Sequence, residues 1–289
     1  MRLVVASMLA LMAFSPAIRA QNTADGRFTL ETGWLNVAID GRAYRLAAHI
    51  FRPAGAGPFP LVVIHHGIPV SSADARKQKL GFSIASAWFA QRGYLVVVAQ
   101  RPGFGESDGP FLEFSGRCPD RDYVREGRDT AVIESAIIRS AVALSGVDPQ
   151  KIIVVGQSAG GFGAIALGDA PPPGVLGIIS FAGGRGGDDH EHICGGAERL
   201  AQAAGVFGRT NQIPQLWLYA ANDHFFPSSV AHMLFDAYHA GSKPAIRFVG
   251  LPPFDGDGHK TLGYADPSVW ADPVSEFMTE VLEPRSQEH

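Results

Sequence analysis

Short apolar runs recur along the chain, and each is bounded by glycine, proline or charged residues. Runs of this length that are rich in Val, Ile, Leu and Phe are typical of strands buried on both faces of a sheet. Two earlier segments, 29–40 and 42–53, have mixed polarity and meet at Asp40-Gly41, which predicts an antiparallel pair. The buried strands are predicted at 60–67, 94–100, 151–157, 175–184, 214–223 and 245–251.

Helical spacing of apolar residues occupies the intervals between these strands. Residues 122–146 place Val124, Ala131, Ile138 and Val142 along one rough stripe, which predicts a helix with one buried face. Alternation of strands and helices predicts a parallel sheet with helices on both faces, and the absence of repeats or long linkers favours one α/β domain. Further helices are predicted at 73–93, 159–170, 228–241 and 267–282, the last with a kink at Pro273.

The first twenty residues have the pattern of a secretory signal peptide. Arg2 is followed by an apolar run from Leu3 to Phe14, and Ala20 offers a small residue at the cleavage point. A membrane anchor is disfavoured because the run is well short of the roughly 20 apolar residues that a span needs. We therefore predict a signal peptide at 1–20, a single domain at 21–289, and export to the periplasm or the medium with no stable membrane insertion.

Composition narrows the class of protein further. The formal net charge is −4, and no basic stripe is present that would indicate nucleic-acid binding. A hydrophobic content of 46% is sufficient for a large core. The two cysteines, Cys118 and Cys194, predict a disulfide in an exported protein, with two free thiols as the alternative.

The pattern Gly-x-Ser-x-Gly occurs twice, at 105–109 and at 156–160, and it can mark the nucleophilic serine of a hydrolase. Ser158 follows a predicted buried strand and precedes a segment of small apolar residues, which predicts a strand, a sharp turn and a helix. Ser107 instead lies among three glycines and two prolines of the stretch 101–111, which predicts a loop. We predict Ser158 as the nucleophile and the loop of Ser107 as part of the wall beside it.

A nucleophilic serine needs a base to accept its proton and an acid to orient that base. Asp223 directly follows a predicted strand, and His259 lies in the loop after the last one. The chain order Ser158, Asp223, His259 is the order found when these groups follow successive strands of an α/β sheet. Four other acids remain candidates for the orienting role: Asp188, Asp189, Asp255 and Asp257.

Acyl transfer also needs two backbone N–H groups that stabilise the developing oxyanion. One is expected from Ala159, the residue after the nucleophile. The other is expected from Ile68, since Gly67 lets the chain turn sharply after the first buried strand. His65 and His66 are adjacent on that strand and point in opposite directions, so we predict no metal site there and a bracing role for His66.

These motifs together resemble those of the α/β-hydrolase superfamily, and within it the dienelactone-hydrolase-like serine hydrolases. The resemblance covers nearly all of residues 30–282 and implies an α/β-hydrolase fold with a mostly parallel sheet of about eight strands and a cofactor-free acyl-transfer mechanism. The namesake enzymes use a cysteine nucleophile, whereas position 158 here is serine. The motifs that carry the resemblance are HHG (65–67), RPGFGESDG (101–109), GQSAGG (156–161), AAND (220–223) and GDGH (256–259).

The sequence thus predicts an exported serine hydrolase that cleaves a small-molecule carboxylic ester or lactone through an acyl-enzyme. A peptidase or acyltransferase of the same fold is one alternative, and a non-catalytic binding protein is another. Arg185, in the Gly-rich stretch 181–196, is a candidate for binding an anionic substrate group, with a loop-bracing arginine as the alternative. His190 and His192 lie beside acids in the same stretch, and we expect a solvated loop there and no metal.

Overall fold

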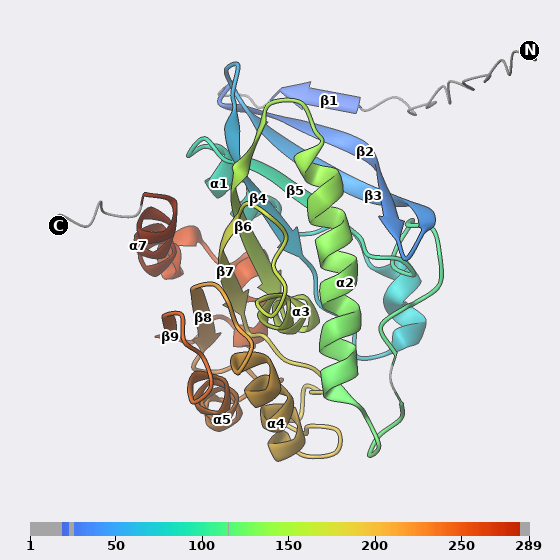
Figure 1. Ribbon diagram of the computed structural model, residues 1–289, viewed down its shortest axis with the longest axis vertical. Coiled ribbons are helices and arrows are strands. Elements are labelled where there is room, and N and C mark those ends of the chain that lie inside the picture. Colours follow the sequence, from blue (N-terminus) through green and yellow to red (C-terminus); the bar gives the residue numbers. More distant parts are fainter. Residues whose placement is uncertain (1–18, 23–25, 115, 284–289) are drawn as a thin grey trace, which may run out of the picture.

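The structure is a computed structural model that describes residues 19–22, 26–114 and 116–283 (Figure 1). Within these residues, one sheet has the strand order β1-β2-β3-β5-β4-β6-β7-β8-β9. The pairs from β1 to β5 in this order are antiparallel, and those from β5 to β9 are parallel. The strands are β1 Arg19–Asn22, β2 Phe28–Ile39, β3 Arg42–Pro53, β4 Phe59–His65, β5 Leu95–Ala99, β6 Val147–Gln157, β7 Val175–Phe181, β8 Gln215–Ala220 and β9 Ile246–Leu251.

The central strands are buried on both faces, which explains their continuous apolar runs. Along β4, Leu61 and Val63 pack into one core, while Val62 and Ile64 pack into the other. All four side chains are fully buried. Successive side chains of a strand point to opposite faces, so each core receives every second residue.

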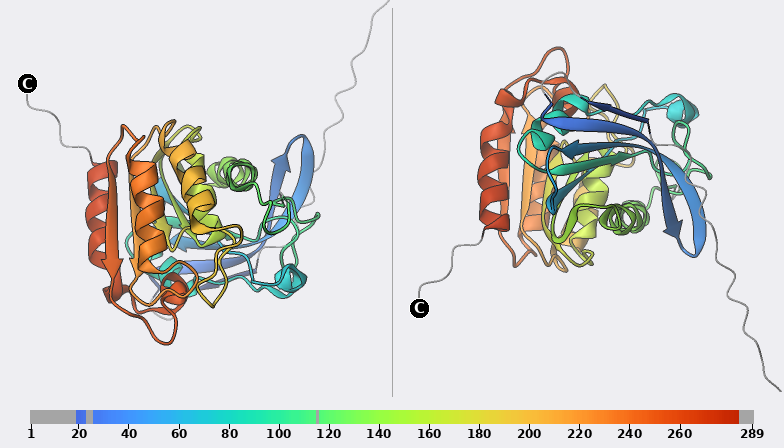
Figure 2. Two further views of the ribbon diagram at one scale, coloured as in Figure 1. Left: turned by 90° about the horizontal axis from the view of Figure 1, so that it is seen from below. Right: turned by 90° about the horizontal axis from the view of Figure 1, so that it is seen from above.

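Helices cover both faces of the sheet, as the alternation of elements predicted (Figures 1 and 2). One core packs β-strand residues against α1 and α7, and the other two lie under α2, α3, α4 and α5. The helices are α1 Ser83–Ala90, α2 Tyr123–Val142, α3 Ala159–Leu167, α4 Ala197–Gly208, α5 Ser228–His239, α6 Thr261–Tyr264 and α7 Ala271–Leu282, with short 3-10 helices at η1 Ser72–Lys77, η2 Gly258–Lys260 and η3 Pro267–Val269.

The fold confirms the predicted α/β-hydrolase architecture and the antiparallel pair. β2 and β3 pair from Phe28–Pro53 to Ile39–Arg42, and Asp40 and Gly41 form the turn with positive φ angles of 47° and 75°. The eight expected strands correspond to β2 through β9. β1 is an additional edge strand that pairs with β2.

The helices differ from the sequence-based prediction in three respects. The single helix expected at 73–93 is divided into η1 and α1, because Gln78 is extended and Phe82 has a left-handed φ of 64°. The expected kink at Pro273 does not occur, since the break lies at Trp270 and Pro273 sits in the first turn of α7, where its missing N–H is harmless. The sequence reading also missed α4, which buries Leu200, Ala204 and Phe207.

The predicted signal peptide falls almost entirely outside the described residues, which begin at Arg19. The residues at the expected cleavage point, Arg19 and Ala20, belong to β1 and pair with Thr32 and Glu31 of β2. In the described part of the chain, no helix combines the length and the apolar character that a membrane crossing requires. The cleavage site and export stay predictions.

Cys118 and Cys194 form the predicted disulfide, with their Cα atoms 5.4 Å apart. The bond joins the loop after β5 to the loop after β7. Two neighbouring contacts reinforce the same junction, because the Tyr123 hydroxyl donates to the carbonyl of Cys194 and Arg199 donates to the carbonyl of Pro119. These two loops also form part of the functional-site region described below.

Replacing both cysteines by serine is expected to lower the free energy of unfolding by about 2–4 kcal/mol, because the unfolded chain then regains the freedom of a long closed loop. The sequence separation that the bond spans is 76 residues. Urea unfolding of the double variant and of the oxidised parent measures the difference. An unchanged unfolding midpoint, or two free thiols in the parent by mass spectrometry, would contradict this account.

Candidate active site

Ser158 occupies a strained turn between β6 and α3. Its backbone angles are φ 57° and ψ −122°, a region that side-chain-bearing residues rarely adopt. Its hydroxyl makes no helix-capping hydrogen bond and is therefore not consumed by the start of α3. The residues on either side of Ser158 in the sequence predicted this strand, turn and helix.

Glycines are needed beside this turn, because a Cβ atom at their positions would clash with neighbouring atoms. A Cβ on Gly160 would lie 2.5 Å from the His65 carbonyl oxygen, and one on Gly156 would clash with the carbonyl of Gly160. A Cβ on Gly67 would lie 2.9 Å from Cβ of Ser158. The loop after β4 and the turn after β6 thus approach each other at van der Waals distance.

Asp223 and His259 are brought together as predicted, from the loops after β8 and β9. Nδ1 of His259 lies 3.1 Å from both carboxylate oxygens of Asp223. Oδ1 of Asp223 also accepts the backbone N–H groups of Phe225 and Phe226, at 2.9 Å each. With Nδ1 engaged by the carboxylate, Nε2 is the nitrogen that remains for proton transfer.

Aromatic and backbone contacts fix the position of the imidazole. The ring stacks on Phe225, with centroids 4.2 Å apart and planes at 22°. Gln157 donates from Nε2 to the His259 carbonyl at 2.8 Å. Asp257, one of the rival acids, accepts the backbone N–H of His259 at 3.0 Å and so positions the loop from the backbone side.

The loop after β4 carries the predicted oxyanion residue and is held by His66. Nε2 of His66 accepts the backbone N–H of Arg101 at 2.9 Å, and Nδ1 lies 2.7 Å from the Gly67 carbonyl oxygen. Burial, aided by the charge of Arg101, lowers the pKa of His66 to about 3, so the ring is neutral and can accept that bond. These bonds are those expected of a residue that braces the loop.

Ile68 and Ala159, the two predicted oxyanion residues, both lie next to Ser158. Ile68 lines the same hollows as the serine, and Ala159 is the first residue of α3. The first N–H groups of a helix have no partner inside the helix, so the amide of Ala159 is available. Their role in holding an oxyanion stays a prediction.

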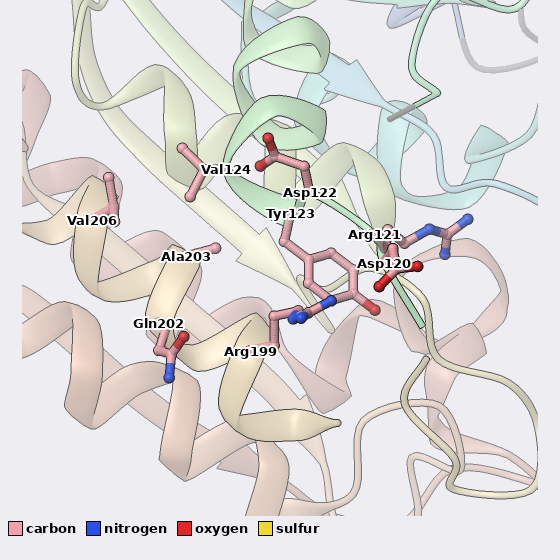
Figure 3. Close-up of a pocket in the computed structure, with 9 residues that line it drawn as sticks. All are labelled: Asp120, Arg121, Asp122, Tyr123, Val124, Arg199, Gln202, Ala203 and Val206. Carbon is pink, nitrogen blue, oxygen red and sulfur yellow. The ribbon is translucent and has the colours of Figure 1, made fainter. Parts of the chain in front are cut away.

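Two hollows adjoin Ser158. The larger has a volume of about 900 Å³ and is also lined by His259, and the smaller has about 180 Å³. A third pocket of about 450 Å³ lies apart from the serine, between the start of α2 and α4 (Figure 3). There, the side chains of Tyr123, Arg199 and Gln202 are among those that line it.

A buried network of charges lies beneath the smaller hollow, and sequence reasoning missed most of it. Glu113 binds Arg101 at 2.5 Å and Arg185 at 2.9 Å, and Glu126 binds Arg185 at 3.3 Å and Arg121 at 3.2 Å. Burial alone would raise the pKa of Glu113, but the two arginines outweigh it and lower the pKa to about 2. The only sequence clue was charge within the Gly- and Pro-rich stretches after two buried strands.

Arg185 is the one network member that the sequence singled out. Its guanidinium is occupied by the two glutamates and by the Glu113 carbonyl, to which it donates at 2.7 Å, and only 5% of the residue is exposed. This arrangement matches the alternative that we kept open, an arginine that braces the loop. A role in binding an anionic substrate group stays a prediction.

The hydroxyl of Ser107 is engaged in hydrogen bonds to the backbone. It donates to the Gln100 carbonyl at 2.7 Å and accepts the backbone N–H of Ala47 at 3.0 Å. The residue is buried and ties β3 to the end of β5. It does not line either hollow beside Ser158, so the predicted wall is formed by later residues of its loop, Phe111 and Phe114.

The acidic and histidine-rich stretch after β7 is organised by backbone bonds. Oδ1 of Asp188 accepts the N–H groups of His190 and His192, at 3.0 and 3.2 Å. Among the residues that the structure describes, no cluster of three or more His, Cys, Asp or Glu side chains is arranged to hold a metal ion.

Comparison with known proteins places the chain in a family. Residues 40–216, more than half of the sequence, match the profile of the X-Pro dipeptidyl-peptidase (S15) family. No protein in the curated comparison set matches the sequence.

Solved structures with low sequence identity share the fold. The Pyrococcus furiosus esterase Pf2001 has a TM-score of 0.61 and 12% identity, and the match covers 94% of this chain and 98% of that one. Acetyl xylan esterase 1 from Thermoanaerobacterium sp. JW/SL YS485 has a TM-score of 0.55 and 16% identity, with 93% and 89% covered. Porphyromonas gingivalis dipeptidyl peptidase 4 has a TM-score of 0.59 and 15% identity, with 87% of this chain but 36% of that one covered.

Replacing Glu113 by glutamine is expected to lower the free energy of unfolding at neutral pH by about 3–5 kcal/mol, since the buried Arg101 loses its carboxylate partner and Arg185 keeps only Glu126. Glu106→Gln, an exposed change in the same loop, is the control and should stay within about 0.5 kcal/mol of the parent. Urea unfolding measures both.

The difference between parent and Glu113→Gln also depends on pH. The pKa of Glu113 is about 2 in the folded protein against 4.5 ordinarily, so its stabilisation is present above 4.5 and is lost as the pH falls toward 2. The two unfolding free energies are expected to converge across that range. A difference that stays constant in acid would contradict the assignment of the charge to Glu113.

The contribution of Glu134 to stability depends on pH in the opposite direction. It is fully buried, neither carboxyl oxygen has a hydrogen-bond partner among the described residues, and burial raises its pKa well above the usual range. The unfolded chain therefore releases this proton at a lower pH than the folded protein, which reduces stability as the pH rises. Glu134→Gln is expected to be more stable than the parent at neutral pH, with the gain vanishing in acid. A gain that is independent of pH would refute this explanation.

Proposed function

This chain belongs to the X-Pro dipeptidyl-peptidase (S15) family, and we propose that it is a serine hydrolase that cleaves carboxylic esters or lactones, with Ser158, His259 and Asp223 as its catalytic residues. One observation carries the proposal. The strained turn at Ser158 and the His259–Asp223 pair meet at one cavity of about 900 Å³. The structures of esterases with the same fold add support at the level of architecture.

In the first half of the reaction, Nε2 of His259 takes the proton of Ser158, and Oγ attacks the carbonyl carbon. The carbonyl oxygen gains negative charge, which the backbone N–H groups of Ile68 and Ala159 hold. His259 then gives its proton to the leaving alcohol as the carbon–oxygen bond breaks. The product of this half is an acyl group esterified to Ser158.

In the second half, water replaces the alcohol. His259 takes a proton from the water, the hydroxide attacks the acyl carbon, and Ser158 leaves as its hydroxyl regains the proton from His259. Asp223 holds the imidazole in the tautomer that presents Nε2 and stabilises its cationic form. The two backbone bonds to Oδ1 of Asp223 keep the carboxylate oriented during both transfers.

We also propose that the protein is exported. The apolar N-terminal run with its leading Arg2 supports a signal peptide, and the Cys118–Cys194 disulfide is compatible with an oxidising compartment.

Peptide-bond cleavage is the second candidate activity, and the family match is the observation that favours it. The same residues would perform that reaction, with an amine as the leaving group. Comparing a p-nitrophenyl ester with an X-Pro p-nitroanilide distinguishes the two candidates. A higher kcat/KM for the anilide would replace the ester proposal with the peptidase.

Ser158→Ala is expected to reduce kcat by as much as about 10⁶-fold on any cleaved substrate, because it removes the nucleophile. His259→Ala should cause a loss of similar scale. Labelling by a fluorophosphonate probe, followed by peptide mapping, should place the probe on Ser158 in the parent.

Ser107→Ala is the matched control, since it alters the second copy of the same motif. It is expected to keep labelling and kcat per folded molecule while losing stability, because the Ala47 N–H loses its acceptor. Full activity in Ser158→Ala, or labelling at Ser107, would refute the proposed nucleophile.

A further inference from the structure

The two hollows beside Ser158 differ in which catalytic group they contain. Ile68, Ser158 and Phe225 line both. His259 lines only the larger hollow, and Ala159 lines only the smaller one. The imidazole of His259 therefore borders the larger hollow and not the smaller one.

This difference assigns each end of an ester substrate to one hollow. The assignment rests on the proposed function. The leaving oxygen must lie within reach of the imidazole that protonates it, so the alcohol extends into the larger hollow. The acyl substituent is attached to the other side of the carbonyl carbon and points away from the imidazole. It consequently enters the smaller hollow.

The smaller hollow suits a compact acyl group. Its volume is about 180 Å³, and its walls include Phe111, Phe225 and Phe226. Glu113 and Arg185, which also line it, are buried and bonded to each other. A long acyl chain would have to displace this ion pair or cover it with hydrocarbon, and either change is costly.

The larger hollow suits a bulky apolar alcohol. Leu80 and Phe82 line it from the segment that joins η1 to α1. Ile84 of α1, Tyr264 and Val70 also line it, and Val70 lines the smaller hollow as well. Val70 is 65% exposed and Tyr264 71%, which is unusual for large apolar side chains. Exposed apolar side chains that gather at one cavity indicate a surface that a ligand covers.

Cationic side chains surround this apolar lining. Lys77, Lys79 and Lys260 line the larger hollow, whereas Asp74 is its one acidic lining residue and pairs with Lys77 at 2.7 Å. Lys260 lies 4.0 Å from Asp257, and no ion pair is recorded for Lys79 within the described residues. The lining of the larger hollow thus has an excess of positive charge.

From these features we propose that the substrate is an ester of a compact acyl group with a large apolar alcohol that has an anionic group at its far end. The acyl group occupies the smaller hollow, the alkyl body of the alcohol lies on the Leu80–Tyr264 side of the larger one, and the anion meets Lys79.

A matched set of esters tests the assignment. We expect octyl acetate to have a kcat/KM at least about tenfold higher than methyl octanoate, which exchanges the two ends of the molecule. Acetylated ω-hydroxyoctanoate should be preferred several-fold over the corresponding neutral amide. That second preference should weaken with added salt, because the lysines are exposed.

Variants test each end separately. Gly81→Leu adds a side chain where no atom lies within 4 Å of the new Cβ, so it should lower kcat/KM for octyl acetate while sparing methyl acetate. Phe114→Ala opens the smaller hollow and should raise the rate on methyl octanoate. Lys79→Glu should remove the preference for the carboxylate, whereas Lys243→Glu, an exposed change that does not line the hollow, should keep it.

The outcomes separate this inference from the proposed function. Ser158-dependent cleavage that favours methyl octanoate over octyl acetate, or that disfavours the carboxylate, overturns the inference and leaves the serine hydrolase standing. Fluorophosphonate labelling of Ser158 with cleavage of none of the acetates overturns it as well. Absence of labelling at Ser158 overturns both.

Discussion

The close contact between the loop after β4 and the turn after β6 is the constraint on which the site depends. Ser158 holds a backbone conformation that side-chain-bearing residues rarely adopt, and Gly67 and Gly160 allow two backbones to approach within the space of a single methyl group. Parallel strands β4 and β6 are hydrogen-bonded neighbours, so their carboxyl ends deliver both segments to the same edge. Strain at one residue is maintained because the surrounding strands and α3 fix every neighbour.

Beneath this contact lies a buried network of charges, in which burial disfavours the charged form of each group and the opposite charge of its partners favours it. Arg101 donates to the His66 carbonyl, and its own backbone N–H holds the His66 ring, so an ion-pair network lies directly under the predicted oxyanion loop. Removing Glu113 would leave the buried Arg101 without a carboxylate partner among the described residues. The network thus connects the loops after β4, β5 and β7, and the disulfide joins the last two again at their outer ends. Loops of this length would otherwise be the mobile part of the fold.

Membership of a family named for a peptidase, combined with a fold shared with esterases, shows that the reacting groups alone do not choose the bond that is cleaved. A serine, a histidine and an aspartate can attack either an ester or an amide. Under the proposed function, the surfaces that contact the two ends of the substrate make the choice, and the two hollows beside Ser158 are unequal in volume and in the side chains that line them. The division of the expected 73–93 helix bears on the larger hollow, because the segment 78–82 between η1 and α1 lines it.

The sequence by itself determined the succession of strands along the chain, the sharp turn at Ser158 and the chain order of Ser158, Asp223 and His259, since these depend on local periodicity and on glycines beside a serine. It also paired the cysteines, because only two are present. Tertiary structure alone decided that Ser107 supports β3, that Arg185 neutralises Glu113, and that the buried carboxyl group of Glu134 has no hydrogen-bond partner among the described residues. Each of these outcomes depends on which distant segments meet, and residue type and spacing carry no record of such long-range contacts. For the same reason, the two hollows beside Ser158 could not be predicted from the sequence.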